Sequence, residues 1–273
     1  MARKLFCEFS PLTYWLSTRK EQLLRHVRDL LSPVSLAIFR QKEPLPCPVY
    51  RHASLIRRRL GNVNMVLQEN KAVNLSLAAP CLSGVVIRPG ETFSFWRLVG
   101  RTSVRRGFRE GLTISAGKPS SGIGGGLCQL TNLLHWMVLH TPLTVTEHHH
   151  HDQLDLFPDY NRQIPFGTGT SICFNYLDYR VRNDTDRAYQ LLVWVDGEYL
   201  RGEVRSDSPQ PLRYHIRTEG EGFVRENGTV YRVGRVFRDV VEPVTGNLLE
   251  RQLLRTNHAR VLYDTENLEI RER

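Results

Sequence analysis

Apolar residues recur at helical spacing near the start of the chain. Over residues 19–31 they follow the i, i+1, i+4, i+7, i+8 pattern that places side chains on one face of a helix. That face consists of Leu23, Leu24, Val27, Leu30 and Leu31. Pro33 ends the predicted helix. We expect the apolar face to pack against the rest of the protein, although the basic opposite face also suits attachment to a membrane surface.

The middle of the chain predicts a second helix and two short strands. Residues 62–81 have helical periodicity, and Gly84 ends this helix. The runs 85–87 and 93–95 are typical of strands, and Pro89-Gly90 between them is typical of a turn.

Beyond residue 168 the pattern becomes that of β-strands. Residues 171–183 and 188–195 are rich in β-branched and aromatic side chains. Hairpin turns are predicted at Asp196-Gly197, Asn227-Gly228 and Thr245-Gly246-Asn247. The expected fold class is α+β, with helices in the N-terminal half, mainly antiparallel strands and a hairpin-rich C-terminal part.

Charge is distributed unevenly along the 273 residues. The chain has 37 Lys and Arg against 28 Asp and Glu, a net charge of +9. Residues 1–60 hold 12 basic and 4 acidic side chains, so this segment alone carries +8. We divide the chain into a basic helical arm and linker (1–60), a core domain (61–208) and a β-hairpin extension (209–273), with three prolines between 43 and 48 marking the linker.

The expected partners and location follow from this charge and from the N-terminus. Polar residues follow Arg3 and Lys4 too soon for a secretory signal, and no stretch is typical of a membrane-spanning helix. Five cysteines without a C-x-x-C pair fit free thiols in a reducing compartment. We expect a cytoplasmic protein, with peripheral contact between residues 1–60 and an anionic inner membrane face as an alternative. No nucleic-acid motif is present, so no nucleic-acid partner is predicted.

The segment 120–140 holds the candidate nucleophile. Its residues 127–139 are apolar on nearly all sides, which predicts a buried helix that packs on the strands and starts with a Gly-Gly-Gly-x-Cys motif. Cys128 falls in the first turn, where the helix dipole is expected to lower the thiol pKa. Gly124, Gly125 and Gly126 would let a substrate backbone approach, and backbone N–H groups there could hold an oxyanion. A buried, inert cysteine is the alternative interpretation.

A histidine tract follows this helix. Glu147 precedes four consecutive histidines, His148 to His151, in a stretch predicted to be extended. Successive side chains then point to opposite faces, with His148 and His150 on one and His149 and His151 on the other. The spacing matches no zinc pattern, so neither a metal nor an organic cofactor is predicted.

Several motifs together resemble those of the VanW family. They are PGETFSFW (89–96), GGGLCQ (124–129), Glu147 with His149 and His151, and LDYRVRNDT (177–185). The resemblance links the chain to vancomycin resistance and cell-wall metabolism. It implies either cysteine-dependent acyl transfer on peptidoglycan stem peptides or their precursors, as in an L,D-transpeptidase, or a non-catalytic accessory module that binds wall precursors or a resistance-complex partner.

The resemblance also implies roles for individual residues. Cys128 corresponds to the nucleophile, His151 to the preferred base and His149 to the second choice. Gln129 and the backbone of 126–128 are oxyanion-hole candidates. Relatives often have Asp where this chain has Gly169, which leaves the group that orients the histidine open. The candidates for that group are Asp178, Glu147 and Asn183.

Three arginines are candidates for binding the substrate. Arg105, Arg106 and Arg109 lie close together in the sequence and could hold the acidic stem peptide or its terminal carboxylate. An exposed basic loop is the alternative interpretation.

Overall fold

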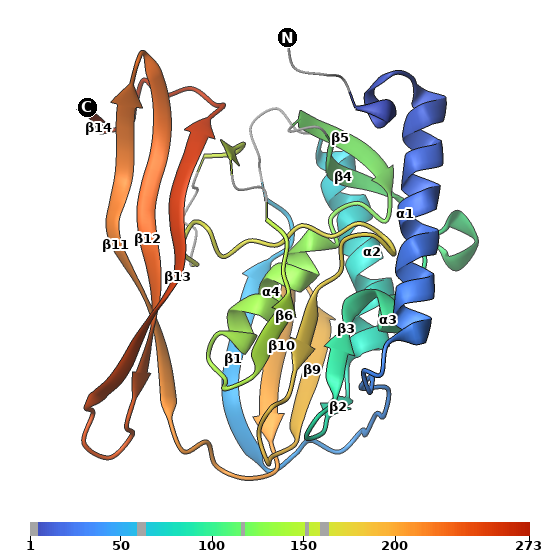
Figure 1. Ribbon diagram of the computed structural model, residues 1–273, viewed down its shortest axis with the longest axis vertical. Coiled ribbons are helices and arrows are strands. Elements are labelled where there is room, and N and C mark those ends of the chain that lie inside the picture. Colours follow the sequence, from blue (N-terminus) through green and yellow to red (C-terminus); the bar gives the residue numbers. More distant parts are fainter. Residues whose placement is uncertain (1–4, 59–63, 116–117, 151–152, 159–163) are drawn as a thin grey trace.

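The structure is a computed structural model that describes residues 5–58, 64–115, 118–150, 153–158 and 164–273 (Figure 1). It contains the expected α+β arrangement. Its central sheet has the strand order β1-β10-β9-β2 and is antiparallel throughout. These strands are β1 (Cys47–Leu55), β2 (Val85–Ile87), β9 (Tyr189–Asp196) and β10 (Tyr199–Ser206).

Two helices pack on this sheet. Helix α2 (Met65–Leu82) contacts β9, and α4 (Cys128–Val138) contacts β10 and β1. The side chain of Asn64 caps α2 by accepting a hydrogen bond from the backbone N–H of Val66. Leu75 of α2 and Leu134 of α4 are fully buried in the same hydrophobic core as the strands. The α4 bounds agree with the predicted buried helix.

Smaller elements surround the core. A three-stranded sheet has the order β3 (Thr92–Ser94), β8 (Arg180–Arg182), β6 (Thr144–Glu147). The hairpin of β4 (Glu110–Ser115) and β5 (Lys118–Ile123) leads into the glycine turn before α4. The short helical elements are η1 (Phe6–Glu8), α3 (Phe95–Val99) and η2 (Val104–Arg106).

The C-terminal part forms a second large sheet beside the core (Figure 1). Its strand order is β14-β11-β12-β13-β7. These strands are β7 (Leu154–Asp155), β11 (Arg213–Glu226), β12 (Thr229–Val241), β13 (Leu248–Val261) and β14 (Ile270–Glu272). All three predicted hairpins are confirmed. At the β11–β12 turn both Asn227 (φ 49°) and Gly228 (φ 76°) have the positive φ that such tight turns require.

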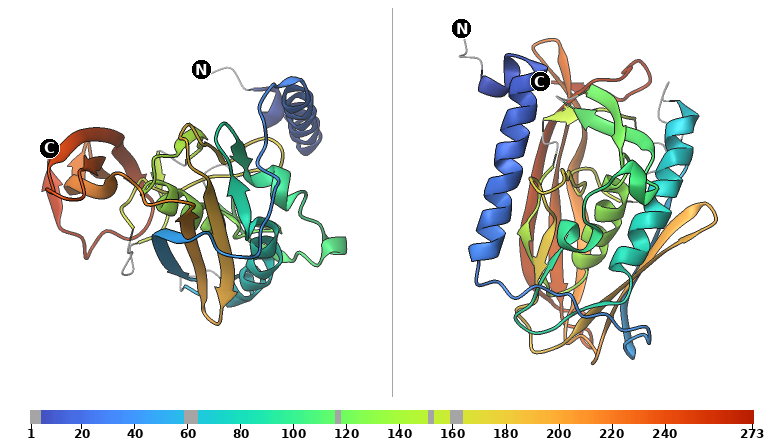
Figure 2. Two further views of the ribbon diagram at one scale, coloured as in Figure 1. Left: turned by 90° about the horizontal axis from the view of Figure 1, so that it is seen from below. Right: turned by 90° about the vertical axis from the view of Figure 1, so that its right-hand side faces the viewer.

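Helix α1 (Pro11–Leu31) lies on the opposite side of the core from the C-terminal sheet (Figure 2). It begins at Pro11, well before the predicted start at residue 19, because Ser10 and Thr13 form a capping box there. The expected packing of its apolar face is wrong. No α1 residue is buried, and Leu30 and Leu31 are each 77% exposed. Polar side chains face the core instead.

Two further expectations differ from the structure. The sequence predicts one strand over residues 171–183, but within this range only β8 (Arg180–Arg182) is a regular strand. The backbone before it turns instead of extending along a neighbouring strand: the N–H of Cys173 donates to the carbonyl oxygen of Leu177 (2.9 Å), and the N–H of Asp178 donates to the side chain of Glu147 (2.8 Å). In addition, β1 falls within the expected 1–60 arm but is a strand of the core sheet. No helix within the described residues is long and apolar enough to cross a membrane.

Candidate active site

A groove of about 1390 Å³ runs between α1 and the core, and we call it the Cys128 groove. The glycine turn and Cys128 form part of its wall, and Tyr14 of α1 lies on another side. The segment 169–174 and His150 also line it. The groove therefore brings the candidate nucleophile and one histidine of the tract to a common space.

Cys128 is the first residue of α4, as predicted, but its thiol is not activated by that position. Burial raises the pKa of the thiol above its ordinary value, and backbone hydrogen bonds at Ile172 and at Cys128 itself oppose the rise without cancelling it. The expectation of a lowered pKa is therefore wrong. Loss of water destabilises the thiolate more than these backbone hydrogen bonds stabilise it. Proton removal at neutral pH then requires a nearby base.

The glycines before Cys128 are required by close packing. A Cβ atom on Gly125 would lie within 3.0 Å of the carbonyl oxygen of Gly111 in β4, and one on Gly124 would lie within the same distance of Thr102. Gly126 has φ +92°, and its missing Cβ leaves the space that the stem of Lys71 fills. The turn lines the groove because it lies against α2 and β4.

Asn74 of α2 holds this turn in place. Its buried side-chain amide donates to the carbonyl oxygens of Gly125 (2.9 Å) and Arg109 (3.0 Å). The backbone N–H of Arg109 donates back to the Asn74 amide oxygen (2.8 Å). Arg109 thus supports the site through its backbone, while its side chain is not part of the described groove lining.

The histidines alternate as the extended pattern predicts. The rings of His148 and His150 lie 6.4 Å apart, and Nε2 of His148 is 2.8 Å from the carbonyl oxygen of Gly169. His149 points to the other side, where its Nε2 is 3.0 Å from Glu147. His150 is the histidine of this tract that lines the Cys128 groove within the described part of the chain. The preferred base, His151, lies outside the described residues.

Gly169 faces His150. A Cβ on residue 169 would lie 3.0 Å from Nε2 of His150, so glycine leaves room for this ring. Asn132, one helical turn after Cys128, accepts hydrogen bonds from the N–H (2.7 Å) and hydroxyl (2.8 Å) of Thr170. These bonds hold the segment around Gly169 over the first turn of α4.

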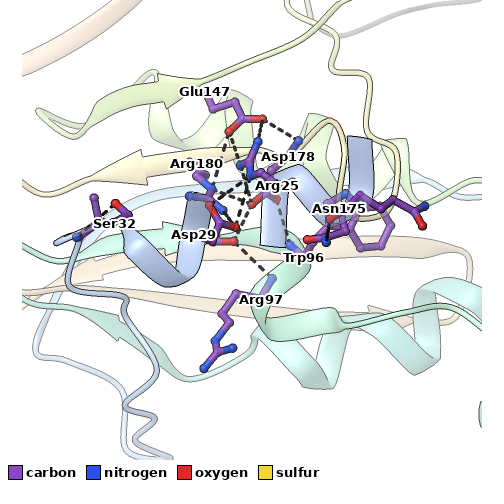
Figure 3. Close-up of polar contacts among 12 residues, drawn as sticks. Arg25, Asp29, Ser32, Trp96, Arg97, Glu147, Asn175, Asp178 and Arg180 are labelled. Carbon is purple, nitrogen blue, oxygen red and sulfur yellow. Dashed lines mark hydrogen bonds and ion pairs between the residues drawn. The ribbon is translucent and has the colours of Figure 1, made fainter. Parts of the chain in front are cut away.

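Asp178 and Glu147 lie in an ion-pair network that joins α1 to the core (Figure 3). Asp178 accepts hydrogen bonds from the N–H of Trp96 (3.0 Å) and from Nε of Arg180 (2.9 Å). Glu147 accepts one from Arg25 of α1 (3.0 Å). Burial by itself raises the pKa of Glu147, but hydrogen bonds from Arg25, the Asp178 N–H and His149 lower it to about 2.

This network lines a second cavity, of about 410 Å³, rather than the Cys128 groove. The structure therefore does not bring Asp178 together with Cys128. Asn183, the third candidate for the group that orients the histidine, is not part of the described lining of the Cys128 groove. Its side-chain amide donates to the carbonyl oxygen of Ile87 in β2 (2.8 Å).

The remaining predicted residues have structural contacts. The amide of Gln129 donates to the hydroxyl of Ser54 and the carbonyl oxygen of Leu55, both at 2.9 Å, so it is engaged beside the groove. Arg106 donates to the carbonyl oxygens of Val99 (2.8 Å) and Arg101 (2.7 Å). Arg105 is exposed, and neither arginine belongs to the described groove lining.

Sequence reasoning missed three groove residues. Lys71 and Gln68 of α2 line the groove, and so does a second thiol, Cys173. Burial, with the charges of Arg58 and Arg57, lowers the pKa of Lys71 to about 7. The i, i+3 spacing of Gln68 and Lys71 on one predicted helical face was the available signal, but it did not show that the face is buried.

Comparisons with known proteins identify the family of this chain. The sequence model of the family described as VanW like protein matches residues 70–205, which include the glycine turn and α4. The chain is 39% identical over 227 residues to the vancomycin B-type resistance protein VanW of Enterococcus faecalis, covering 83% of this chain and 80% of that protein. It is 28% identical over 118 residues to the uncharacterized protein YoaR of Bacillus subtilis, covering 42% of this chain and 36% of that protein. No solved structure matches the chain. The long enterococcal alignment and the family match across the site show that the chain belongs to the VanW family.

Proposed function

We propose that this protein transfers acyl groups of peptidoglycan stem peptides or their precursors, with Cys128 as the nucleophile, in a process linked to vancomycin resistance. The observation that carries the proposal is that Cys128, at the start of α4, and His150 line one groove. The groove is large enough for a peptide, since small-molecule sites typically occupy about 300–1,000 Å³. The relative named for vancomycin B-type resistance supports the choice of substrate class.

The proposed chemistry uses a thiol and a histidine that line the same groove. The Cys128 sulfur attacks a peptide carbonyl carbon while His150 takes the thiol proton, and a C–S bond forms. The C–N bond then breaks, and the imidazolium gives its proton to the leaving amine. An acceptor amine then attacks the thioester and gives a proton to His150, the C–S bond breaks, and His150 returns this proton to the sulfur, which restores the thiol. The backbone N–H groups of 126–128 are the candidates for holding the oxyanion.

Intact-mass analysis of the full chain with a stem tetrapeptide as donor tests this proposal. The wild type should gain the mass of the acyl group, and Cys128→Ala should not. Cys173→Ala is the matched control, because it removes the other groove thiol and should retain the adduct. His150→Gln should slow acylation at least about 100-fold, the lower end of general-base effects. Full transfer activity in Cys128→Ala, or no adduct in the wild type, would exclude the proposal.

A second function is supported by the exposed apolar face of α1. We also propose that α1 docks the protein on an anionic membrane surface as an accessory module. The helix leaves Trp15, Leu23, Leu30 and other large apolar side chains exposed, within a segment 1–60 of net charge +8. Each basic residue near an anionic surface contributes about 1 kcal/mol. Amphipathic helices of this kind lie in the membrane interface.

Sedimentation with phosphatidylglycerol-containing vesicles tests the docking proposal. Leu23→Glu/Leu30→Glu should abolish binding without affecting the ion pairs of α1. Val244→Glu, which changes a side chain that is 90% exposed near the β12–β13 turn, is the matched control and should bind like the wild type. Equal binding by the α1 double variant would contradict docking through this face.

A further inference from the structure

Lys71 is a nearly buried cation on the wall of the Cys128 groove. The residue is 7% exposed, and its stem packs against Gly126, two residues before Cys128. Two residues of chain span about 7 Å, so the stem lies close to the candidate nucleophile. Among the described residues, no carboxylate forms an ion pair with Lys71. A buried ammonium without an anion is unfavourable, as its lowered pKa shows.

Gln68 lies one helical turn before Lys71 on the same face of α2. It is 0% exposed and lines the groove, yet neither its amide nitrogen nor its amide oxygen has a hydrogen-bond partner within the described part of the chain. Leaving a buried polar group unpaired costs about 1–3 kcal/mol. Lys71, which has no carboxylate partner among the described residues, and the unpaired amide of Gln68 therefore face the same groove.

The charges nearby make this end of the groove electropositive. Arg57 and Arg58 follow β1 and both lower the pKa of Lys71. Arg57 has its own partner, Glu69, at 2.7 Å. The acidic residues of the described groove lining also have partners, since Glu21 pairs with Lys20 (3.0 Å) and Asp155 accepts from Tyr263 (2.9 Å). Within the described residues, no carboxylate of the groove lining is left to pair with Lys71, so the site suits an anionic ligand.

We propose that Lys71 and Gln68 form a carboxylate subsite of the Cys128 groove, which binds the free C-terminal carboxylate of the donor peptide. The inference rests on the proposed acyl transfer and names its donor class. One residue of extended peptide spans about 3.5 Å. A leaving group of one or two amino acids with a free carboxylate would therefore reach about 3.5–7 Å from Cys128, toward the wall that the Lys71 stem forms at Gly126. Lys71 Nζ donates to this carboxylate, and the amide nitrogen of Gln68 donates a second hydrogen bond.

Binding to the Cys128→Ala protein tests the subsite without turnover. Two fluorescent stem peptides that differ only in a C-terminal acid or amide are compared by anisotropy. The acid should bind at least about tenfold more tightly, because one charge-assisted hydrogen bond contributes about 1.5–3 kcal/mol and each 1.4 kcal/mol is tenfold. Adding Lys71→Met, which keeps the stem on Gly126, should bring the ratio near 1. Adding Gln68→Leu should lower it a few-fold.

Lys42→Met is the matched control, since Lys42 is an exposed lysine and should leave the ratio unchanged. Equal binding of the acid and amide peptides to the Cys128→Ala protein would overturn the subsite. This comparison can be made without any substitution of Lys71. Stronger competition by pyrophosphate than by a D-alanyl dipeptide acid would also overturn it, in favour of a phosphate site. If wild-type protein forms no thioester but the acid preference persists, acyl transfer fails and the subsite stands as a binding site. If the thioester forms without any acid preference, acyl transfer stands and the subsite is overturned.

Discussion

Removal of Arg25 should loosen α1 from the core. The Arg25 side chain is 12% exposed, and its guanidinium donates to Glu147 (3.0 Å) and to Asp29 (3.2 Å). Breaking a buried ion pair by deleting one partner costs about 3–5 kcal/mol. Arg180 remains 2.9 Å from Asp178 and 3.7 Å from Glu147. These two carboxylates therefore keep one cationic partner when Arg25 is removed. We expect Arg25→Ala to lower the free energy of unfolding by about 2–3 kcal/mol.

Urea unfolding followed by circular dichroism measures this loss. Arg28→Ala is the matched control, because Arg28 is an exposed arginine on the same helix and its loss should cost less than about 0.5 kcal/mol. Adding Glu147→Gln to Arg25→Ala should recover part of the stability, because it removes the carboxylate that lost its partner. Equal unfolding free energies for Arg25→Ala and Arg28→Ala would refute the reasoning, and the network would then be no more than a surface contact.

Two further perturbations test the site and its surroundings. Gly126→Ala should destabilise the protein more than Gly90→Ala in urea unfolding. Both glycines have positive φ, but a Cβ on Gly126 meets Lys71, whereas one on Gly90 meets nothing within 4 Å. Equal losses of unfolding free energy would show that the turn can shift. The pKa of Glu147 is lowered to about 2 from 4.5, so its contribution to stability is complete above pH 4.5 and is lost as pH falls toward 2. Glu147→Gln should therefore show a smaller loss of stability between about pH 5 and pH 2, and parallel pH profiles would contradict the role of Arg25 in that shift.

The α1 helix shows the limit of reasoning from periodicity. The pattern located the helix correctly at its C-terminal end, Leu31, but the apolar face was assigned to the core. In the structure, Arg25 and Asp29 make the contacts with the core, because partners for them come from Glu147 and Arg180, more than 100 residues away in the chain. An amphipathic pattern shows that a helix has two faces, and only the fold decides which one is covered.

The sequence by itself determined the elements whose causes lie within a few residues. Asn227-Gly228 specifies its hairpin because both residues accept positive φ, and the apolar run 127–139 specifies a buried helix that starts at Cys128. The family resemblance also comes from contiguous motifs. The tertiary structure decided that His150 faces the groove, that Lys71 is buried beside Gly126, and that the Cys128 thiol is desolvated. Burial and pKa depend on neighbours from distant parts of the chain, so local sequence cannot specify them.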